Sequence, residues 1–322
     1  MTASLPPDMP TGAELAAALR PLFAATTGAM DAVVVARRPN AYTSSSRSEV
    51  VTIRDPRGDH RNYLVKYDRG GRDPTPSCRH GIDYCGRVYE SLLAALPLCH
   101  LRTLGTIRVG PTAVPALVIE HLDDSFRVGE APEVSGILAA AEWCGCFHHL
   151  AEPLQSEPAL GFLVRYDRGY YQAWADRAER LAATAARSGA WLSRACAAFH
   201  EMAGDLAAAP TTIIHGEMSP QNVLWRNGEI YPVDWESAAI GPGEIDLAAL
   251  LFGWPEETVA RCIEAYWEAL RKPRPSEFAT RWAAATLYTA LRWLPSPDAG
   301  DDPRFSLALD RLRETASAVG VV

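Results

Sequence analysis

The stretch "IIHGEMSPQNVLW", residues 213–225, decides the fold, because it sets three polar side chains between two apolar runs. These side chains are His215, Glu217 and Asn222, and a glycine and a proline interrupt the segment that carries them. The apolar runs on either side are typical of short buried strands, whereas glycine and proline mark a loop. We therefore expect a polar loop that leads directly into a strand.

A hairpin is predicted immediately after this loop. Asn227 and Gly228 form the strongest short hairpin signal, because both residues tolerate positive φ. If they are the two loop residues, position 226 pairs with 229 and position 222 faces 233. Asn222 and Asp234 then lie at the same open end of the hairpin. An amide oxygen beside a carboxylate suits Mg²⁺, which takes few protein oxygens and fills its shell with water and phosphate.

Glu217 lies five residues before Asn222, on the loop that leads into this open end. A carboxylate close to a metal-bound phosphate can accept a proton from an attacking hydroxyl. The sequence therefore predicts a magnesium site made by Asn222 and Asp234, with Glu217 beside it as a general base.

The rest of the chain changes character along its length. Up to about residue 124 it alternates β-branched runs with turn residues, and the segment 55–59 marks a hairpin turn. Beyond that point it is rich in Ala, Leu and Trp at helical spacing, over residues 134–151, 170–208, 255–271 and 277–293. We expect an α+β fold of two lobes: a small, mostly antiparallel β lobe at residues 1–121, and a larger, mostly helical lobe at 122–322.

Two segments carry a resemblance to a known family. "HGEMSPQNVLW" followed by "VDWESAAIGPGEIDLAAL" resembles the catalytic loop and metal-binding segment of the aminoglycoside phosphotransferase and choline kinase superfamily, whose fold is similar to that of protein kinases. The resemblance implies that Glu217 is the catalytic base and that Asn222 and Asp234 hold Mg²⁺. It also implies that Asp246 is structural and that His215 braces the loop.

The same resemblance extends to the N-terminal lobe and implies a nucleotide site. Lys66 stands where the family has the lysine that contacts the α- and β-phosphates of ATP. Ser45 belongs to a polar segment, residues 39–49, in the place of the loop that covers the phosphates, although an ordinary polar loop is an equal alternative. Glu120 and Leu122 lie in the place of the hinge that receives adenine through backbone groups.

This chain departs from the family pattern at two positions. Glu217 replaces the usual Asp, and its extra methylene moves the carboxylate by roughly 1.5 Å, a displacement that can cost about a hundredfold in rate. Cys85 occupies the place where kinase-like folds have a helix glutamate that pairs with the lysine. Asp83 and Glu90 are the nearby acidic substitutes, and we favour Glu90 as the partner of Lys66.

Three functions compete on this evidence. The first is an ATP- and Mg²⁺-dependent kinase that phosphorylates a hydroxyl of a small molecule, such as an aminoglycoside, amino sugar or amino alcohol. The second is a catalytically silent binding protein that keeps the kinase-like shell. The third, a hydrolase that uses His215, Glu217 and Ser219, is disfavoured because adjacent loop positions rarely give the required geometry and no "GxSxG" elbow is present. We favour the kinase.

Composition and charge argue against a nucleic-acid partner, a secretory signal and a membrane span. The 322 residues are 48% hydrophobic and carry a formal net charge of −8. No long basic run is present, so we expect no nucleic-acid partner. The first residues resemble no secretory signal, and no window of about twenty residues is free of charges or breakers. We therefore expect a cytoplasmic protein without a membrane span.

The cysteines indicate reduced thiols. The chain has seven, and Cys144 and Cys146 are one residue apart in an apolar helical pattern, which does not suit a disulfide framework. His148 and His149 follow them closely. A metal site is one interpretation of this cluster, and a helix face with two solvated histidines is the one that we favour.

Overall fold

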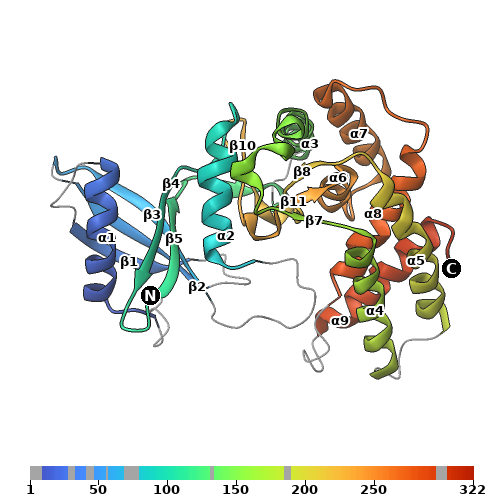
Figure 1. Ribbon diagram of the computed structural model, residues 1–322, viewed down its shortest axis with the longest axis horizontal. Coiled ribbons are helices and arrows are strands. Elements are labelled where there is room, and N and C mark those ends of the chain that lie inside the picture. Colours follow the sequence, from blue (N-terminus) through green and yellow to red (C-terminus); the bar gives the residue numbers. More distant parts are fainter. Residues whose placement is uncertain are drawn as a thin grey trace. The chain divides into compact units, whose positions relative to one another are not determined.

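The fold is taken from a computed structural model that describes residues 9–27, 33–40, 47–55, 57–68, 80–130, 134–184, 190–294 and 303–322. The chain forms two compact units, coloured along the sequence in Figure 1. The first unit is Met1–Phe126 together with Leu224–Ser237, and the second is Arg127–Val223 together with Ala238–Val322. Among the described residues, no helix is long and apolar enough to span a membrane.

A five-stranded antiparallel sheet forms the centre of the first unit, in the order β1-β2-β3-β5-β4. Its strands are β1 (Val33–Pro39), β2 (Arg47–Arg54), β3 (His60–Tyr67), β4 (Thr103–Val109) and β5 (Val114–Glu120). The predicted turn between β2 and β3 is confirmed: the Asp55 N–H donates to the Asp59 carbonyl at 2.9 Å, and Gly58 has a φ of 91°.

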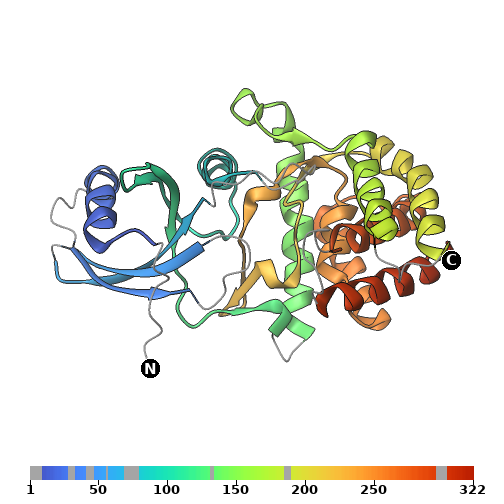
Figure 2. The same ribbon diagram turned by 90° about the horizontal axis from the view of Figure 1, so that it is seen from below.

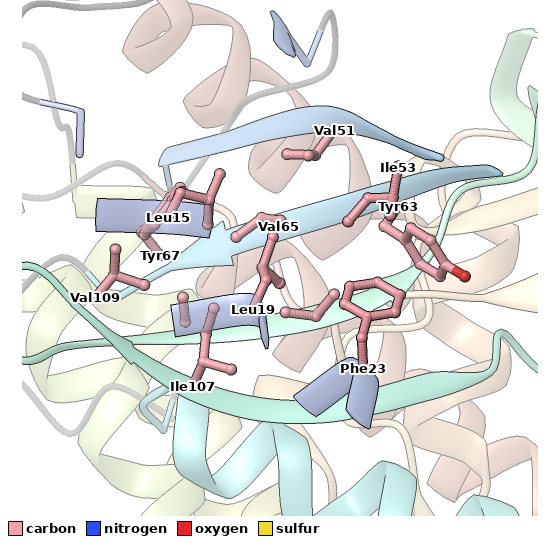
Figure 3. Close-up of a cluster of buried hydrophobic side chains, with 12 residues drawn as sticks. Leu15, Leu19, Phe23, Val51, Ile53, Tyr63, Val65, Tyr67, Ile107 and Val109 are labelled. Carbon is pink, nitrogen blue, oxygen red and sulfur yellow. The ribbon is translucent and has the colours of Figure 1, made fainter. Parts of the chain in front are cut away.

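Helix α1 (Gly12–Thr27), which was not predicted from the sequence, covers one face of this sheet. Figure 3 shows Leu15, Leu19 and Phe23 of this helix packed on side chains of the strands. Strand β3 contributes Tyr63, Val65 and Tyr67 to this cluster, because alternate residues of a strand point to the same face. The cluster comprises Leu15, Leu19, Phe23, Val51, Ile53, Tyr63, Val65, Tyr67, Ile107, Val109, Ala116 and Val118.

Helix α2 (Ile82–Arg87) packs on the opposite face. A Cβ atom on Gly86 would lie 2.5 Å from the Thr106 hydroxyl and 3.7 Å from a Leu117 methyl, so the helix backbone lies close to β4 and β5. Figures 1 and 2 both show β4 and β5 between α1 and α2. The helix continues as a π-helical stretch (Val88–Leu92) and a 3-10 turn (Leu93–Ala95). Since Val65 faces α1, its neighbour Lys66 faces α2.

The predicted hairpin at Asn227 and Gly228 is confirmed. It joins β9 (Val223–Arg226) to β10 (Glu229–Pro232), and the two turn residues have φ values of 52° and 83°. The sheet order is β10-β9-β6, where β6 is Phe126–Arg127. A 3-10 turn (Trp235–Ser237) follows. From Leu224 to Ser237 the chain thus belongs to the first unit, a return that the expected division at residues 121 and 122 did not include.

The second unit is mostly helical, with one small sheet in the order β7-β11-β8. Its strands are β7 (Val164–Arg165), β8 (Thr212–Ile214) and β11 (Ala239–Gly241). Its helices are α3 (Val134–Ala151), α4 (Arg168–Thr184), α5 (Ala190–Ala208), α6 (Glu244–Leu251), α7 (Glu256–Leu270), α8 (Phe278–Arg292) and α9 (Pro303–Ala318). Its 3-10 turns are Val128–Glu130, Glu152–Ser156, Pro158–Leu160 and Pro220–Asn222.

The helices of this unit fall in the stretches that were expected to be helical, with some differences. The stretch expected at 170–208 divides into α4 and α5, which lie side by side in Figure 2, and α6 and α9 were not predicted. Helices α3 and α7 pack closely at Gly145, where a Cβ atom would lie 2.3 Å from the Tyr266 carbonyl. Glycine is therefore required at this crossing.

Candidate active site

The polar loop is fixed to the second unit by a buried carboxylate. Strand β8 ends at Ile214, and Gly216 has a φ of 77° that turns the chain out of it. Asp246 of α6 accepts hydrogen bonds from the His215 N–H at 2.6 Å and from the Gly216 N–H at 2.8 Å. Asp246 is completely buried, so these charge-assisted bonds are shielded from water. This geometry agrees with the structural role that the resemblance implies for Asp246.

The same carboxylate ties the loop to two further helices. His148 of α3 lies 3.1 Å from Asp246 Oδ2 through Nε2, and 2.9 Å from the Tyr266 hydroxyl of α7 through Nδ1. Cys144 Sγ lies 3.9 Å from the same ring. His148 is fully buried, so the expected solvated face is wrong for this residue. Both its nitrogens and both Asp246 oxygens have partners, which makes this cluster a hydrogen-bond network rather than a ready metal site.

Hydrogen bonds within the loop orient Glu217 and Asn222. The Asn222 Nδ2 donates to the Glu217 carbonyl at 3.0 Å, and the Glu217 N–H donates to His215 Nδ1 at 3.2 Å. His215 is buried and therefore braces the loop from inside. Because the NH₂ group of Asn222 is the donor, its amide oxygen is the atom that can bind a cation.

Arg292, the last residue of α8, contacts the predicted base. Its Nη2 lies 3.2 Å from Glu217 Oε2, and its Nη1 donates to the Gly216 carbonyl. The guanidinium also lies 5.9 Å from the ring centroid of Trp174, and only 7% of the side chain is exposed. Sequence reasoning missed this residue, because one arginine at the end of an amphipathic helix carries no signal for a contact 75 residues away.

Replacing Arg292 with Met should lower kcat of the phosphoryl transfer proposed below by roughly 10- to 100-fold, because both the loop and the Glu217 carboxylate lose their brace. Arg292→Lys should recover only part of this loss, since an ammonium cannot reproduce the forked contact. Steady-state kinetics measures both. Arg274→Met is the matched control, because Arg274 pairs with Glu264 at an exposed site. An equal loss in this control would contradict the prediction.

In the first unit, the predicted phosphate-binding lysine is paired with acids of the segment after β10. Lys66 Nζ lies 2.8 Å from Asp234 Oδ1 and also contacts the Glu236 carboxylate. Burial favours the neutral amine, but the charges of Asp234 and Glu236 outweigh it, and the pKa of Lys66 is raised. Lys66 is therefore a buried, charged ammonium. Asp234 has a φ of 67°, a sparsely populated conformation of the kind that gathers at functional sites.

The expectation that Glu90 pairs with Lys66 is not met. Glu90 is exposed, and one of its oxygens would be 3.8 Å from a Cβ atom on Gly105 of β4. Asp83 pairs instead with Arg108, at 2.8 Å. Glu90 lies beyond the end of α2, in the π-helical stretch Val88–Leu92, and not on the α-helical turn that carries Cys85. Burial raises the pKa of the Cys85 thiol to about 12, so Cys85 is neutral and cannot replace an acid.

The remaining predicted positions are those that the resemblance assigns to a nucleotide site, and that assignment stays a prediction. Ser45 lies outside the described residues. Glu120 ends β5, and its N–H donates to the Arg102 carbonyl at 2.8 Å. The Leu122 carbonyl accepts from the Ser125 hydroxyl at 2.8 Å. Asn222 belongs to the second unit and Asp234 to the first, so their joint binding of one metal ion stays a prediction.

Solved structures of antibiotic phosphotransferases share this fold. Macrolide 2'-phosphotransferase MphH from Brachybacterium faecium is 17% identical and has a TM-score of 0.56, with 92% of this chain and 96% of that chain covered. The GDP complex of wild-type aminoglycoside 2'-phosphotransferase-IIIa is 11% identical with a TM-score of 0.63, covering 92% and 97%. A thermostable mutant of aminoglycoside phosphotransferase APH(4)-Ia, in a ternary complex with ADP and hygromycin B, is 16% identical with a TM-score of 0.61, covering 94% and 97%.

Sequence comparison gives the family. No curated protein matches the chain. The profile of the phosphotransferase enzyme family APH, however, matches residues 57–286, which include Lys66, the polar loop and the segment that carries Asp234. The expected kinase-like fold is thereby confirmed, and the chain belongs to this family of phosphotransferase enzymes.

Proposed function

We propose that the protein transfers the γ-phosphoryl group of ATP to a hydroxyl of a small molecule, in the cytoplasm and with Mg²⁺. The observation that carries the proposal is the ion pair between buried Lys66 and partly exposed Asp234, at 2.8 Å. It sets a cation suited to the α- and β-phosphates beside an acid suited to the metal. Burying the Lys66 ammonium is costly, and the proposed contact with phosphate gives this lysine a function.

The groups of this chain divide the work of the reaction. Lys66 would bind phosphate oxygens, and Asn222 and Asp234 would hold the metal, which would neutralise charge on the phosphates. The Leu122 N–H has no acceptor among the described residues, so it is available for adenine. Glu217 accepts the proton of the acceptor hydroxyl while its oxygen bonds to the γ-phosphorus and ADP leaves. Most of the rate comes from positioning and charge.

The acceptor that we propose is an aminoglycoside, an amino sugar or an amino alcohol. The acidic balance of the chain supports a cationic acceptor. The structures of similar fold include an enzyme that holds hygromycin B together with ADP.

Nucleotide turnover tests this function. Nucleoside diphosphate release is measured with ATP or GTP and Mg²⁺ against a panel of aminoglycosides, amino alcohols, macrolides and nucleosides, and Asp234→Asn is the inactive control. We expect turnover with at least one acceptor. Saturating nucleotide at a hundred times Kd should also stabilise the fold by about 2.7 kcal/mol. Stabilisation without turnover on any acceptor would instead support the silent binding protein. If neither stabilisation nor turnover is observed, the proposed nucleotide site is refuted.

A further inference from the structure

Two acids contact Lys66, and both come from the "DWE" segment that follows β10. Only 7% of the lysine side chain and 10% of the Glu236 side chain are exposed, whereas Asp234 is 32% exposed. Glu236 is therefore the more deeply buried partner. Its side chain was not among the residues that the sequence pattern singled out.

Helix α2 supplies no acid at this place. Cys85 is the residue of α2 that lies near Lys66, and it is 1% exposed. The helix acid Asp83 is engaged by Arg108, and Glu90, in the π-helical continuation, is exposed near β4. Among the described residues, a lysine buried on this face depends on Asp234 and Glu236 for its counter-charge.

The backbone of Glu236 is fixed by a hydrogen bond to its own carbonyl and by the burial of the residue before it. Its carbonyl accepts a hydrogen bond from the His80 N–H at 2.8 Å. The preceding residue, Trp235, is fully buried, and its indole N–H donates to the Pro232 carbonyl at 3.1 Å. A carboxylate on so fixed a backbone can hold an ammonium in one position at little entropic cost.

We propose that Glu236 is the positioning residue for Lys66, in place of an acid on α2. The inference rests on the proposed function and deepens it. In the proposed reaction Asp234 would hold the metal, and its charge would then be shared between the metal and Lys66. Glu236 then remains as the partner that keeps the Lys66 ammonium aimed at the phosphates. Position 85 on α2 therefore does not need an acidic residue, and Cys85 can occupy it.

Moving the acid to the helix tests this directly. Glu236→Gln should raise KM for the nucleotide, and lower kcat/KM, by roughly 10- to 100-fold. Adding Cys85→Glu to Glu236→Gln places a carboxylate on the other side of Lys66 and should recover at least about tenfold of the loss. The double variant Cys85→Gln and Glu236→Gln has the same size without the charge and should recover nothing. No recovery by Cys85→Glu in a folded protein overturns the proposal.

A second readout does not depend on activity or on folding of the helix variant. In the nucleotide-free protein, Glu236→Gln should lower Tm by roughly 5 °C, and the same change in a Lys66→Met background should lower it far less. Additive Tm losses would show that the two side chains are not coupled and would overturn the proposal. A loss of kcat/KM for Glu90→Gln equal to that of Glu236→Gln would do so as well.

Metal dependence separates this role from metal binding. If Glu236 acts through Lys66, Glu236→Gln leaves the Mg²⁺ concentration for half-maximal rate within about twofold of the wild type, whereas Asp234→Asn raises it strongly. A large shift for Glu236→Gln overturns the proposal. An inactive wild type refutes the proposed function instead, and the Tm coupling is still measurable in that case.

Discussion

Asp246→Ala is expected to lower the free energy of unfolding by about 3–5 kcal/mol. The change removes a fully buried carboxylate that accepts hydrogen bonds from the His215 and Gly216 N–H groups and faces His148. Each N–H is then buried without an acceptor, and the penalty is that of desolvated polar groups. Urea unfolding followed by tryptophan fluorescence measures this, because the chain has nine tryptophans.

The control for this variant is Asp310→Asn on α9. Asp310 is exposed, and such surface changes usually stay within about 0.5 kcal/mol. We also expect Asp246→Ala to lose phosphoryl transfer, since the loop that carries Glu217 is no longer tied to α6. A variant with unchanged stability would show that the backbone N–H groups of the loop find water instead.

Glu217→Gln should lower kcat by roughly 10²- to 10⁴-fold and leave nucleotide affinity unchanged. Gln is isosteric with Glu but cannot accept the hydroxyl proton, so the loss reports proton transfer or orientation of the acceptor and not packing. Rapid-mix measurement of the chemical step, with calorimetry of nucleotide binding, separates the two effects.

Glu217→Asp is the informative companion to this change. It shortens the side chain by one methylene, which withdraws the carboxylate from Arg292 Nη2, now 3.2 Å away. We expect kcat of Glu217→Asp to lie between that of the wild type and that of Glu217→Gln, because the charge remains but its position changes. Full activity of Glu217→Gln would exclude Glu217 as the base and favour a role in the ion pair with Arg292 alone.

The sequence predicted features that depend on local pattern. Asn227 and Gly228 specify their turn through positive φ, and the hairpin forms where expected. The α3 and α8 ranges follow from apolar spacing. Helix α1 was missed because it contains a proline and precedes a region of predicted strands, so the whole region was expected to be mostly β.

The missed site residues share a physical cause. Glu236 and Arg292 act through contacts with residues far away in the sequence, Lys66 and Glu217. Local periodicity carries no information about such pairs, because the fold as a whole brings them together. Glu90 is the expected partner of Lys66 only because kinase-like folds place a helix acid against this lysine, and Glu236 does not lie on that helix. A search for acids close to Asp234 in the sequence would have offered Glu236.

The return of Leu224–Ser237 to the first unit has a consequence for dissecting the molecule. The polypeptide passes between the units after Phe126, after Val223 and after Ser237, so neither unit is one uninterrupted piece of chain. A fragment cut at Phe126 would retain Lys66 without either of its carboxylates and would strand an ammonium in an apolar interior. Independent expression of the first unit therefore requires residues 224–237 to be grafted back through a linker, or supplied as a complementing peptide.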